Sequence, residues 1–534
     1  MRLTYQGLKD SQAWKNAGID LPPYSPEDLA ANTRKSPRWV HFGIGNIFRI
    51  FVGGIADSLI RSGLMDTGIV CAETFDFDVV DKIYKPFDNL ALAVTLHPDG
   101  KQDKRVLASL TEAVKAQPRF TDDWARLKEV FTAPSLQLVS FTITEKGYAL
   151  HGADGQYFPF VNADIENGPE KCGGAMAVVA SMLFARFKAG AKPLALVSMD
   201  NVSHNGQKLR ESVIDMAEKW YERNFVPADF VAWVKDEGKV SFAWTMIDKI
   251  TPRPSEDVAK MLETSGVEDM GIVVTSKRTY IAPFVNAEKP GYLVIEDKFP
   301  NGRPPLEKAE QVYMTDRNTV NLSERMKLTT CLNPIHSALC TYDRLLGYEL
   351  FADGMHDPEL SKLAQRVGYD DGLPVVTDPG IISPRDFLKE CLEVRFPNAY
   401  LGDTSARIAT DISQGLAFRF GETVKAYVAR DGSAAKLTGI PLAIAGWLRY
   451  LLAVDDKGEK FELSPDPMNA EMSSHFAGVT PENAAEKLKP ILSNTHIFGV
   501  DLYEAGLGGK IEEMFTEMLK GNGAVRAVLK KYLA

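Results

Sequence analysis

The stretch Trp39-Val-His-Phe-Gly-Ile-Gly-Asn-Ile-Phe-Arg49 decides the fold that we expect for this chain. A short extended run leads into the closely spaced glycines Gly43 and Gly45, and a helical pattern continues from Asn46 to Ile60. Glycines at such a strand–turn–helix junction let the backbone approach a pyrophosphate, and the helix N-terminus favours the anion. The third glycine of a GxGxxG pattern is missing, so a purely structural turn explains the stretch about equally well.

The second apolar strand that we expect, Gly68 to Ala72, ends at Glu73. A carboxylate in this position can accept hydrogen bonds from both ribose hydroxyls of a dinucleotide, and it repels a 2′-phosphate. The pattern therefore favours NAD over NADP, with Asp76 as a competing candidate for the same role. A glycine turn followed by an acid also suits S-adenosylmethionine, so a methyltransferase is an alternative for this segment.

Strands and helices alternate through the first part of the chain. Further buried strands are expected at 136–143, 194–198 and 271–275, with helical patterns such as 174–189 between several of them. This alternation predicts parallel βαβ units and a doubly wound α/β sheet. We expect a Rossmann-type dinucleotide-binding domain over residues 1–320, in which the first forty residues form an arm before the sheet.

The character of the sequence changes to helical after residue 320. A chain of 534 residues is too long for one core, and the turn-rich segment Phe299–Pro305 lies just before the change. We expect a mostly α-helical substrate and catalytic domain over residues 321–534. Its helical patterns lie at 321–346, 358–367, 384–394, 403–418, 440–452, 483–492 and 509–532.

Composition narrows the class of protein. The hydrophobic fraction of 45% and the charged fraction of 25% are ordinary for a globular protein, and a net charge of −10 argues against nucleic-acid binding. The five cysteines are scattered without CxxC spacing, which indicates neither a zinc site nor a disulfide framework and suits a reducing cytoplasm. The longest apolar run, Leu437 to Val454, contains Pro441 and Arg449, so we expect a core helix and no membrane partner. Nothing in the sequence indicates the oligomeric state.

Polar residues follow several of the expected strands. Thr144 and Glu145 follow one strand, and Asn201 follows another, where side chains of an open α/β sheet line the ligand site. A capped turn or a solvated loop explains each of these segments about as well. Asp248 is a lone acid in an apolar run, for which a surface salt bridge is the simpler explanation.

The stretch Arg325-Met-Lys-Leu-Thr-Thr-Cys-Leu-Asn-Pro-Ile-His-Ser337 places Lys327, Asn333 and His336 inside an otherwise apolar helical pattern. A lysine that must be desolvated is rare without a partner or a task, and burial lowers its pKa toward neutrality. Such an amine can accept and return a proton, while the amide can donate to a developing alkoxide. Taken alone, the cluster also fits a helix end with a polar rim.

Together these segments resemble the long-chain mannitol dehydrogenase family of polyol and sugar-acid dehydrogenases. The motifs GxGNxxR, TxTEKGY, DNxxxNG, MIDKITP, IEDxFPxGRPxxE, LNxxHS and RFxNxxxxDTxxRxxxD occur in the family's order between about Trp39 and Asp411. The resemblance implies an NAD(P)-dependent, zinc-independent oxidoreductase with a Rossmann-type N-terminal domain and a helical C-terminal domain, and no metal site.

The resemblance also implies roles for individual residues. Lys327 corresponds to the general acid/base, Asn201 and Asn333 to the pair that holds the substrate oxygen, and His336 to an orienting partner. Asp248 corresponds to a residue that links solvent to the lysine, and Arg407 to a substrate-binding cation. The cofactor-binding residues implied in this way and by the strand-end patterns are Gly43, Gly45, Asn46, Arg49, Glu73, Thr144 and Glu145.

Two departures from the family pattern carry expectations of their own. The usual lysine lies five residues before its asparagine, whereas Lys327 lies six before Asn333. Because one helical residue rotates a side chain by about 100°, a local bulge is needed to return Lys327 to its place. The lysine that polyol members carry after Asp-x-Ser-Gln is Gly415 here.

The sequence around Arg419 and Lys425 is instead reminiscent of the uronate-reducing branch. A carboxylate-bearing substrate suits Arg407 together with Lys425 or Arg419. We therefore expect fructuronate/mannonate as the substrate couple and NAD(H) as the cofactor, with a mannitol 2-dehydrogenase or a tagaturonate reductase as alternatives. A non-catalytic NAD-sensing protein is a further alternative, and the polar set at Lys327, Asn333 and His336 argues against it.

Overall fold

The computed structural model describes all 534 residues, which form two compact units, Met1–Asn321 and Leu322–Ala534. None of the helices in either unit combines the length and the apolar character that crossing a bilayer requires.

The first unit is organised around a six-stranded parallel sheet with the strand order β6-β3-β2-β7-β8-β9. Numbered along the sheet's own sequence, this is the order 3-2-1-4-5-6 of a doubly wound dinucleotide-binding fold. The predicted Rossmann-type sheet is therefore confirmed. Its strands are β2 (Trp39–Phe42), β3 (Ile69–Glu73), β6 (Leu110–Lys115), β7 (Leu138–Phe141), β8 (Leu194–Ser198) and β9 (Val240–Ala243).

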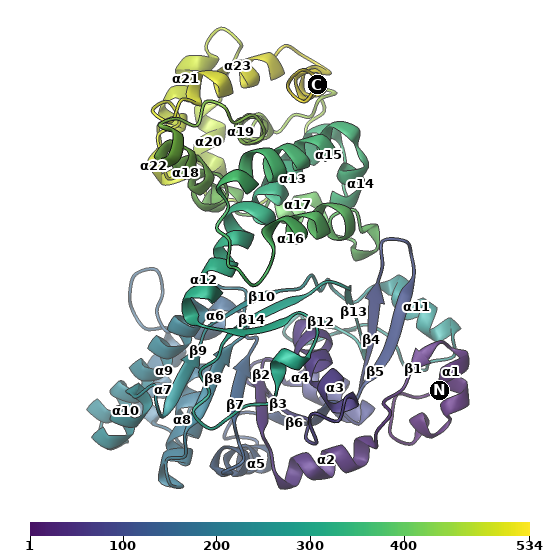
Figure 1. Cartoon of the computed structure of the whole chain (residues 1–534). Coiled ribbons are helices and arrows are strands. Elements are labelled where there is room, and N and C mark those ends of the chain that lie inside the picture. The colour runs from purple at the N-terminus through teal and green to yellow at the C-terminus, as the bar shows by residue number, and fades with distance from the viewer. The chain divides into compact units, whose positions relative to one another are not determined.

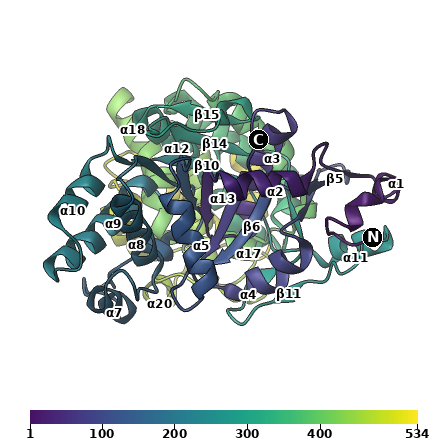
Figure 2. The same ribbon diagram turned by 90° about the horizontal axis from the view of Figure 1, so that it is seen from below.

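Both faces of this sheet are covered, as a parallel sheet requires. Side chains alternate along β2, so Val40 and Phe42 belong to one apolar cluster and Trp39 belongs to the other. The first face packs against α5 (Thr121–Thr132), α8 (Ala175–Lys188), α9 (Asn205–Glu222) and α10 (Ala228–Lys235), and Figure 2 shows α5, α8 and α9 side by side. The second face packs against α3 (Gly53–Arg61).

Smaller sheets complete the first unit. The order β10-β14-β15 joins β10 (Thr245–Asp248), β14 (Tyr292–Glu296) and β15 (Val312–Thr315). The order β1-β5-β4-β13 joins β1 (Ile19–Asp20), β5 (Gln102–Leu107), β4 (Ala91–Leu96) and β13 (Phe284–Glu288). Both sheets are visible in Figure 1 beside the six-stranded one.

The strand expected at 271–275 is wrong as a sheet strand. Only Val273–Val274 (β11) is extended there, and it pairs with Tyr280–Ile281 (β12) in a two-stranded hairpin. Val274 is 52% exposed, and Ile272 and Val273 pack only at the margins of the apolar clusters. The outermost strands of the sheet are β6 and β9, which the apolar-run criterion missed because charged or short segments form them.

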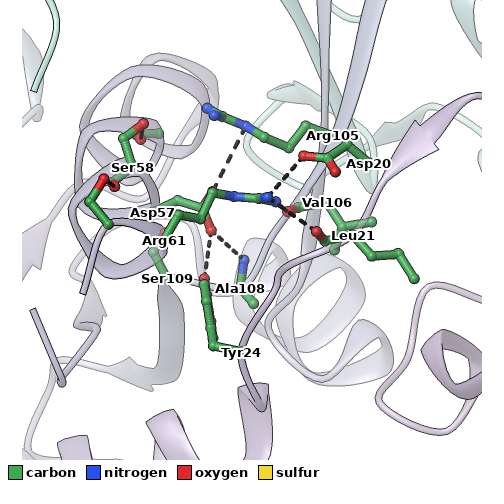
Figure 3. Close-up of polar contacts among 12 residues, drawn as sticks. Asp20, Leu21, Tyr24, Asp57, Ser58, Arg61, Arg105, Val106, Ala108 and Ser109 are labelled. Carbon is green, nitrogen blue, oxygen red and sulfur yellow. Dashed lines mark hydrogen bonds and ion pairs between the residues drawn. The ribbon is translucent and has the colours of Figure 1, made fainter. Parts of the chain in front are cut away.

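The first forty residues pair and form hydrogen bonds with the rest of the first unit, so they are not the separate arm that we expected. They contain α1 (Ser11–Asn16) and α2 (Pro26–Lys35), and β1 pairs in parallel with β5. A buried carboxylate, Asp57 of α3, fixes this segment: it accepts a hydrogen bond from the Tyr24 hydroxyl at 2.6 Å and pairs with Arg61 at 2.6 Å (Figure 3). Arg61 in turn donates to Asp20 at 2.8 Å.

The second unit is helical, which confirms the predicted fold class. Its centre is α13 (Asn333–Leu346), which packs against α19 (Gly439–Tyr450), and α19 packs against α23 (Gly508–Met518). Around them lie α14 (Phe351–His356), α15 (Pro358–Gln365), α16 (Pro384–Glu390), α17 (Ser405–Ile408), α18 (Glu422–Asp431), α20 (Asn469–His475), α21 (Ala484–Leu492), α22 (Thr495–Phe498) and α24 (Ala524–Tyr532) (Figure 1).

Five of the seven helices predicted after residue 320 are interrupted. The patterns over 358–367 and 384–394 pass from α15 and α16 into π-helical turns. The pattern over 321–346 is divided among α12 (Arg317–Met326), a π-helical turn at Lys327–Cys331 and α13. The pattern over 403–418 gives only the short α17 followed by 3₁₀ and π turns, and glycines 521 and 523 break the pattern over 509–532. Apolar periodicity alone does not distinguish a continuous helix from one that changes its hydrogen-bond step.

Candidate active site

A side chain would meet different surroundings at Gly43 and at Gly45. Gly43 has φ +86°, and a Cβ there would lie 2.1 Å from the carbonyl oxygen of Thr142, so the turn can close against β7 only without a side chain. A Cβ on Gly45 would meet nothing within 4 Å. The open side of Gly45 therefore leaves room for a ligand at the start of the helix, as a dinucleotide phosphate requires.

The turn is tied to the neighbouring strand by buried polar groups. The Thr142 hydroxyl donates to the carbonyl of Gly43 at 2.7 Å, and the ring of His41 lies between Ser140 and Thr142 at 2.6 and 2.9 Å. Burial holds the pKa of His41 well below its usual range, so the imidazole is neutral. Sequence reasoning did not single out this histidine, because nothing in its apolar strand indicated polar partners on β7.

Glu73 lies at the end of β3, and its carboxylate is largely occupied by backbone amides. It accepts from the amides of Thr74, Phe75 and Asp76 at 2.9 to 3.2 Å and from the amide of Ile44 at 3.4 Å. Burial raises the pKa of Glu73, while these four amides oppose that shift. Glu73 thus joins the acid loop, which we define as residues 73–78, to the glycine turn of residues 43–45.

Asp76 has one carboxylate oxygen available to accept a hydrogen bond from a ligand. One carboxylate oxygen accepts from the Thr275 hydroxyl at 2.6 Å, and the other is buried without a hydrogen-bond partner. An unpaired buried acceptor is costly unless a ligand completes it, and a ribose hydroxyl is a suitable donor. The residues at the end of β3 therefore fit the ribose of a dinucleotide, with Asp76 as well placed as Glu73.

Asn46 and Arg49 follow the glycine turn but are engaged within the unit. Arg49 is buried and donates to the carbonyl of Ala282 and to the amide oxygen of Asn46, both at 2.7 Å. Asn46 donates to the carbonyl of Tyr280 at 3.4 Å. Burial lowers the pKa of Arg49 to about 10. The guanidinium therefore holds Asn46 in place and joins the turn to the chain that follows β12.

Thr144 and Glu145 begin α6 (Thr144–Tyr148), after β7. The amides of Ile143 and Thr144 donate to the carboxylate of Asp200 at 2.9 and 2.8 Å, and the Tyr148 hydroxyl donates to it at 2.6 Å. Burial raises the pKa of Asp200. Asp200 thus fixes the loop after β7 to the loop after β8, a role that sequence reasoning missed, whereas Glu145 is exposed and ion-paired with Lys208.

Asn201 and Asp248 are the other candidate residues of the first unit. Asn201 is exposed in the loop that Asp200 anchors, just before α9. Asp248 ends β10 opposite Tyr292 of β14 and is buried.

In the second unit, Lys327 opens the π-helical turn Lys327–Cys331 and is only 2% exposed. The amide of Leu332 donates to the carbonyl of Lys327 at 3.2 Å, which closes a turn over five residues instead of four. Such a turn absorbs one additional residue before α13 begins at Asn333. The bulge predicted from the six-residue spacing is therefore present.

Asn333 and His336 lie in the first turn of α13. The carboxamide oxygen of Asn333 is buried without a hydrogen-bond partner, so this amide has capacity for a ligand hydroxyl. The ring of His336 packs against Phe351 and Phe396, at centroid distances of 4.9 and 4.7 Å. Burial lowers the pKa of His336 to about 4, so the imidazole is neutral near pH 7.

The three candidate substrate-binding cations differ in their surroundings. Arg407 is 67% exposed and forms a bidentate ion pair with Asp403, with contacts of 2.6 and 2.5 Å. Lys425 is 45% exposed and pairs with Glu422 at 2.9 Å. Arg419 is largely shielded and donates to the hydroxyl of Ser337 at 2.7 Å.

Comparison with protein families matches almost the whole chain. Residues 37–308 match the mannitol dehydrogenase Rossmann domain, and residues 320–519 match the mannitol dehydrogenase C-terminal domain. Together the two matches include every candidate site residue described above, and they leave out residues 1–36, 309–319 and 520–534.

Individual relatives are similar over their full lengths. The chain is 51% identical to a D-mannonate oxidoreductase from Thermotoga maritima, with 99% of each protein covered. It is 30% identical to a polyol:NADP oxidoreductase from Gluconobacter oxydans, with 88% of this chain and 90% of that protein covered. The substrate-free crystal structure of a D-sorbitol dehydrogenase has a TM-score of 0.80 at 27% identity and covers 96% of this chain and 98% of that one.

Proposed function

The chain belongs to the mannitol dehydrogenase family, and we propose that it interconverts D-fructuronate and D-mannonate by NAD-dependent hydride transfer. The single observation that carries this proposal is the 51% identity, over 99% of both chains, with a D-mannonate oxidoreductase. The family resemblance of the sequence motifs is thereby confirmed. We therefore propose an oxidoreductase, and not the alternatives of a methyltransferase or an NAD-sensing protein.

The first unit holds the cofactor in this proposal. Gly43 and Gly45 bring the backbone to the pyrophosphate, and Asp76 with Glu73 receives the adenosine ribose. Asn46 and Arg49 support the turn, and Thr144 and Glu145 lie on the loop after β7, at the carboxyl ends of the central strands. When bound, NAD(H) supplies the hydride chemistry at the carbinol carbon.

In this proposal, Lys327 is the general acid/base that transfers the proton. Its Nζ accepts the hydroxyl proton in the oxidation and returns it to the same oxygen in the reduction. The amides of Asn201 and Asn333 hold that oxygen as its charge develops, and each such contact is worth about 3 kcal/mol. His336, neutral near pH 7, orients the substrate, and Asp248 passes the proton between the lysine and solvent.

Within the second unit, the π turn supports the assignment of Lys327. Because the turn Lys327–Cys331 holds one residue more than an α-helical turn, the lysine keeps the relation to Asn333 that a five-residue spacing gives in a regular helix. Substrate binding rests on the cations Arg407, Arg419 and Lys425. All five cysteines are buried and unpaired, which supports a reducing cytoplasm as the place of action.

The experiment that tests the proposed function measures NADH oxidation with fructuronate, tagaturonate and fructose. We expect fructuronate to give the highest kcat/KM. A protein that reduces tagaturonate or fructose best, or that shows no NADH-dependent reduction, would contradict the proposal.

The role of Lys327 has its own test. Lys327→Ala should lower kcat by about 10²- to 10⁴-fold, the range that a positioned acid/base contributes, while the Kd for NADH stays within twofold of the wild type. Lys520→Ala, on an exposed helix end, serves as the control. Near-normal turnover of the Lys327→Ala variant would show that another group carries the proton.

A further inference from the structure

The guanidinium of Arg419 is held beside the first turn of α13. Arg419 lies in the π-helical segment Ala417–Gly421, which contacts both α13 and the π turn that begins at Lys327. Its Nη1 donates to Ser337, one residue after His336 and one helical turn after Asn333. Arg419 therefore belongs to the same corner of the second unit as the unpaired Asn333 oxygen.

Arg419, which is half-buried, has fewer partners than the two buried arginines Arg186 and Arg449. Arg186 donates to five backbone carbonyls. Arg449 donates to three. Arg419 has the single contact to Ser337 and forms no ion pair with a carboxylate. A shielded cation without a counter-ion is costly, so a ligand that brings a carboxylate would be bound strongly here.

Gly415 creates the space that Arg419 occupies. A Cβ on Gly415 would lie 2.5 Å from Nε and 2.7 Å from Cζ of Arg419. The backbone of Gly415 is outside the left-handed region, so this position does not need a glycine for its conformation. What the glycine provides is room for the guanidinium.

The neighbouring cations are already neutralised by acids. Glu422 accepts from both Arg325 and Lys425, and Asp403 accepts from Arg407. The positive charge of Arg419 nevertheless acts on His336. Burial is the main cause of the lowered pKa of that imidazole, and the charge of Arg419 contributes to the lowering. Arg419 is thus near the first turn of α13 with its charge uncompensated.

We propose that Arg419 binds the carboxylate of the substrate, that Gly415 admits the guanidinium to this position, and that Ser337 orients it. This inference rests on the proposed function and names the group that makes the site selective for a sugar acid. Gly415 and Ser337 are positioning residues, whereas Arg419 contacts the substrate. A side chain at position 415 would displace Arg419 without preventing folding, since the end of a long side chain can move.

The test compares kcat/KM for fructuronate with kcat/KM for fructose, an uncharged ketose, in four variants. Arg419→Gln and Gly415→Ala should each lower kcat/KM for fructuronate by about 10- to 100-fold, chiefly through KM, and should leave the value for fructose within about threefold. Arg430→Gln, an exposed arginine paired with Asp431, and Gly509→Ala, whose Cβ would meet nothing within 4 Å, are the matched controls. The Kd for NADH should not change in any variant.

Equal losses with both substrates in Gly415→Ala would overturn the inference, because they would indicate a general packing defect. Unchanged preference in Arg419→Gln would overturn it as well. Inhibition by D-gluconate separates the inference from the proposed function. If the wild type reduces only fructose but is inhibited by D-gluconate, and Arg419→Gln abolishes that inhibition, the proposed substrate is wrong and the carboxylate site stands. If such a wild type is not inhibited by D-gluconate, both the inference and the proposed function are wrong.

Discussion

Glu73 and Asp76 lie three residues apart, yet they have different amounts of hydrogen-bonding capacity left for a ligand. Four backbone amides occupy Glu73, whereas one buried oxygen of Asp76 has no partner. Both carboxylates place negative charge where a 2′-phosphate would bind, so both oppose NADP. Only Glu73 also holds the acid loop together.

We therefore expect Glu73→Ser and Asp76→Ser to relax the preference for NAD over NADP. Glu73→Ser should weaken folding more, because it loses four amide contacts whereas Asp76→Ser loses the single contact with Thr275. Loss of the amide contacts of Glu73 should lower the free energy of unfolding by about 2 kcal/mol. Fluorescence titration with NADH and NADPH, together with urea denaturation, measures both effects. A Glu73→Ser protein of wild-type stability would contradict the structural role, and an unchanged cofactor preference in Asp76→Ser would contradict the ribose contact.

His336 provides a pH dependence with a definite sign. Burial lowers its pKa to about 4, below the value of about 6.5 in an unfolded chain, so the unfolded state binds the proton more tightly. The stability that this neutral histidine contributes is present above pH 6.5 and is lost as the pH falls toward 4. Asp371, whose pKa burial raises to about 6, acts in the opposite sense, so the variant must be compared with the wild type at each pH.

His336→Gln should therefore lose less stability than the wild type between pH 7 and pH 5. Urea midpoints at the two pH values measure this difference, with His496→Gln on the exposed surface as the control. A variant with the same pH dependence as the wild type would show that His336 does not titrate in this window.

At the residue scale, the sequence could indicate candidate site residues better than it could indicate the contacts that each of them makes. The spacing of Lys327 and Asn333 predicted a bulge, because the rotation per residue of a helix is fixed, and the π turn is present. The free oxygen of Asp76 and the space beside Gly415 could not be predicted. Asp76 depends on Thr275, which lies 199 residues further along the chain, and the space beside Gly415 depends on the position that the Arg419 side chain adopts one helical turn later.

At the scale of elements, the β2–turn–α3 junction allows a matched pair of substitutions. Gly43→Ala combines a left-handed backbone with a clash against Thr142, and it should destabilise the first unit by several kcal/mol. Gly45→Ala adds a methyl group to open space, so it should fold normally and weaken NADH binding by obstructing the pyrophosphate. Thermal unfolding and NADH titration of both variants separate folding from binding; equal effects of the two would contradict this distinction.

Element prediction from the sequence succeeded for most strands that are continuous apolar runs and failed at the edges of the sheet. The expected strand over 194–198 coincides with β8, whereas β6 and β9 at the sheet edges were missed. β6 carries charged residues at half-buried positions, so it lacks the apolar run of a central strand. The run at 271–275 is apolar but forms one strand of a two-stranded hairpin outside the main sheet, where Thr275 and Ser276 contact Asp76 and Asp78.

On the scale of the whole molecule, the Asp57 network joins segments that are far apart in the chain. It ties Tyr24 and Asp20 to α3 and to the chain around Ala108, whose amide donates to Asp57 at 3.4 Å (Figure 3). Removing one member of a buried ionic cluster leaves the others uncompensated, at a cost of about 3 kcal/mol. The N-terminal segment is therefore expected to contribute to the stability of the first unit.

Asp57→Ala should lower the unfolding midpoint of the first unit. The seven tryptophans make this measurable, because Trp447 is the only one beyond residue 321, and a Trp447→Phe background reports on the first unit alone. Asp99→Ala, at an exposed ion pair, is the control. An unchanged midpoint would show that the N-terminal segment is held mainly by its apolar contacts.

The whole-molecule prediction from the sequence was strongest for the fold class. Alternating strands and helices followed by helices alone predicted a Rossmann-type part and an α-helical part, as observed. Long-range links such as Tyr24 with Asp57 lie outside any periodic pattern, so the first forty residues could not be recognised as part of the first unit.

The widened helical turn beneath Lys327 affects how sequences of this family are to be aligned. One inserted residue is absorbed within a single turn, and every position after Leu332 returns to its usual register. An ungapped column alignment anchored on Asn333 would pair Leu328, the neighbour of Lys327, with the lysine expected five residues before the asparagine, and it would score the protein as lacking the proposed acid/base. Placing the gap among Thr329, Thr330 and Cys331 restores the correspondence.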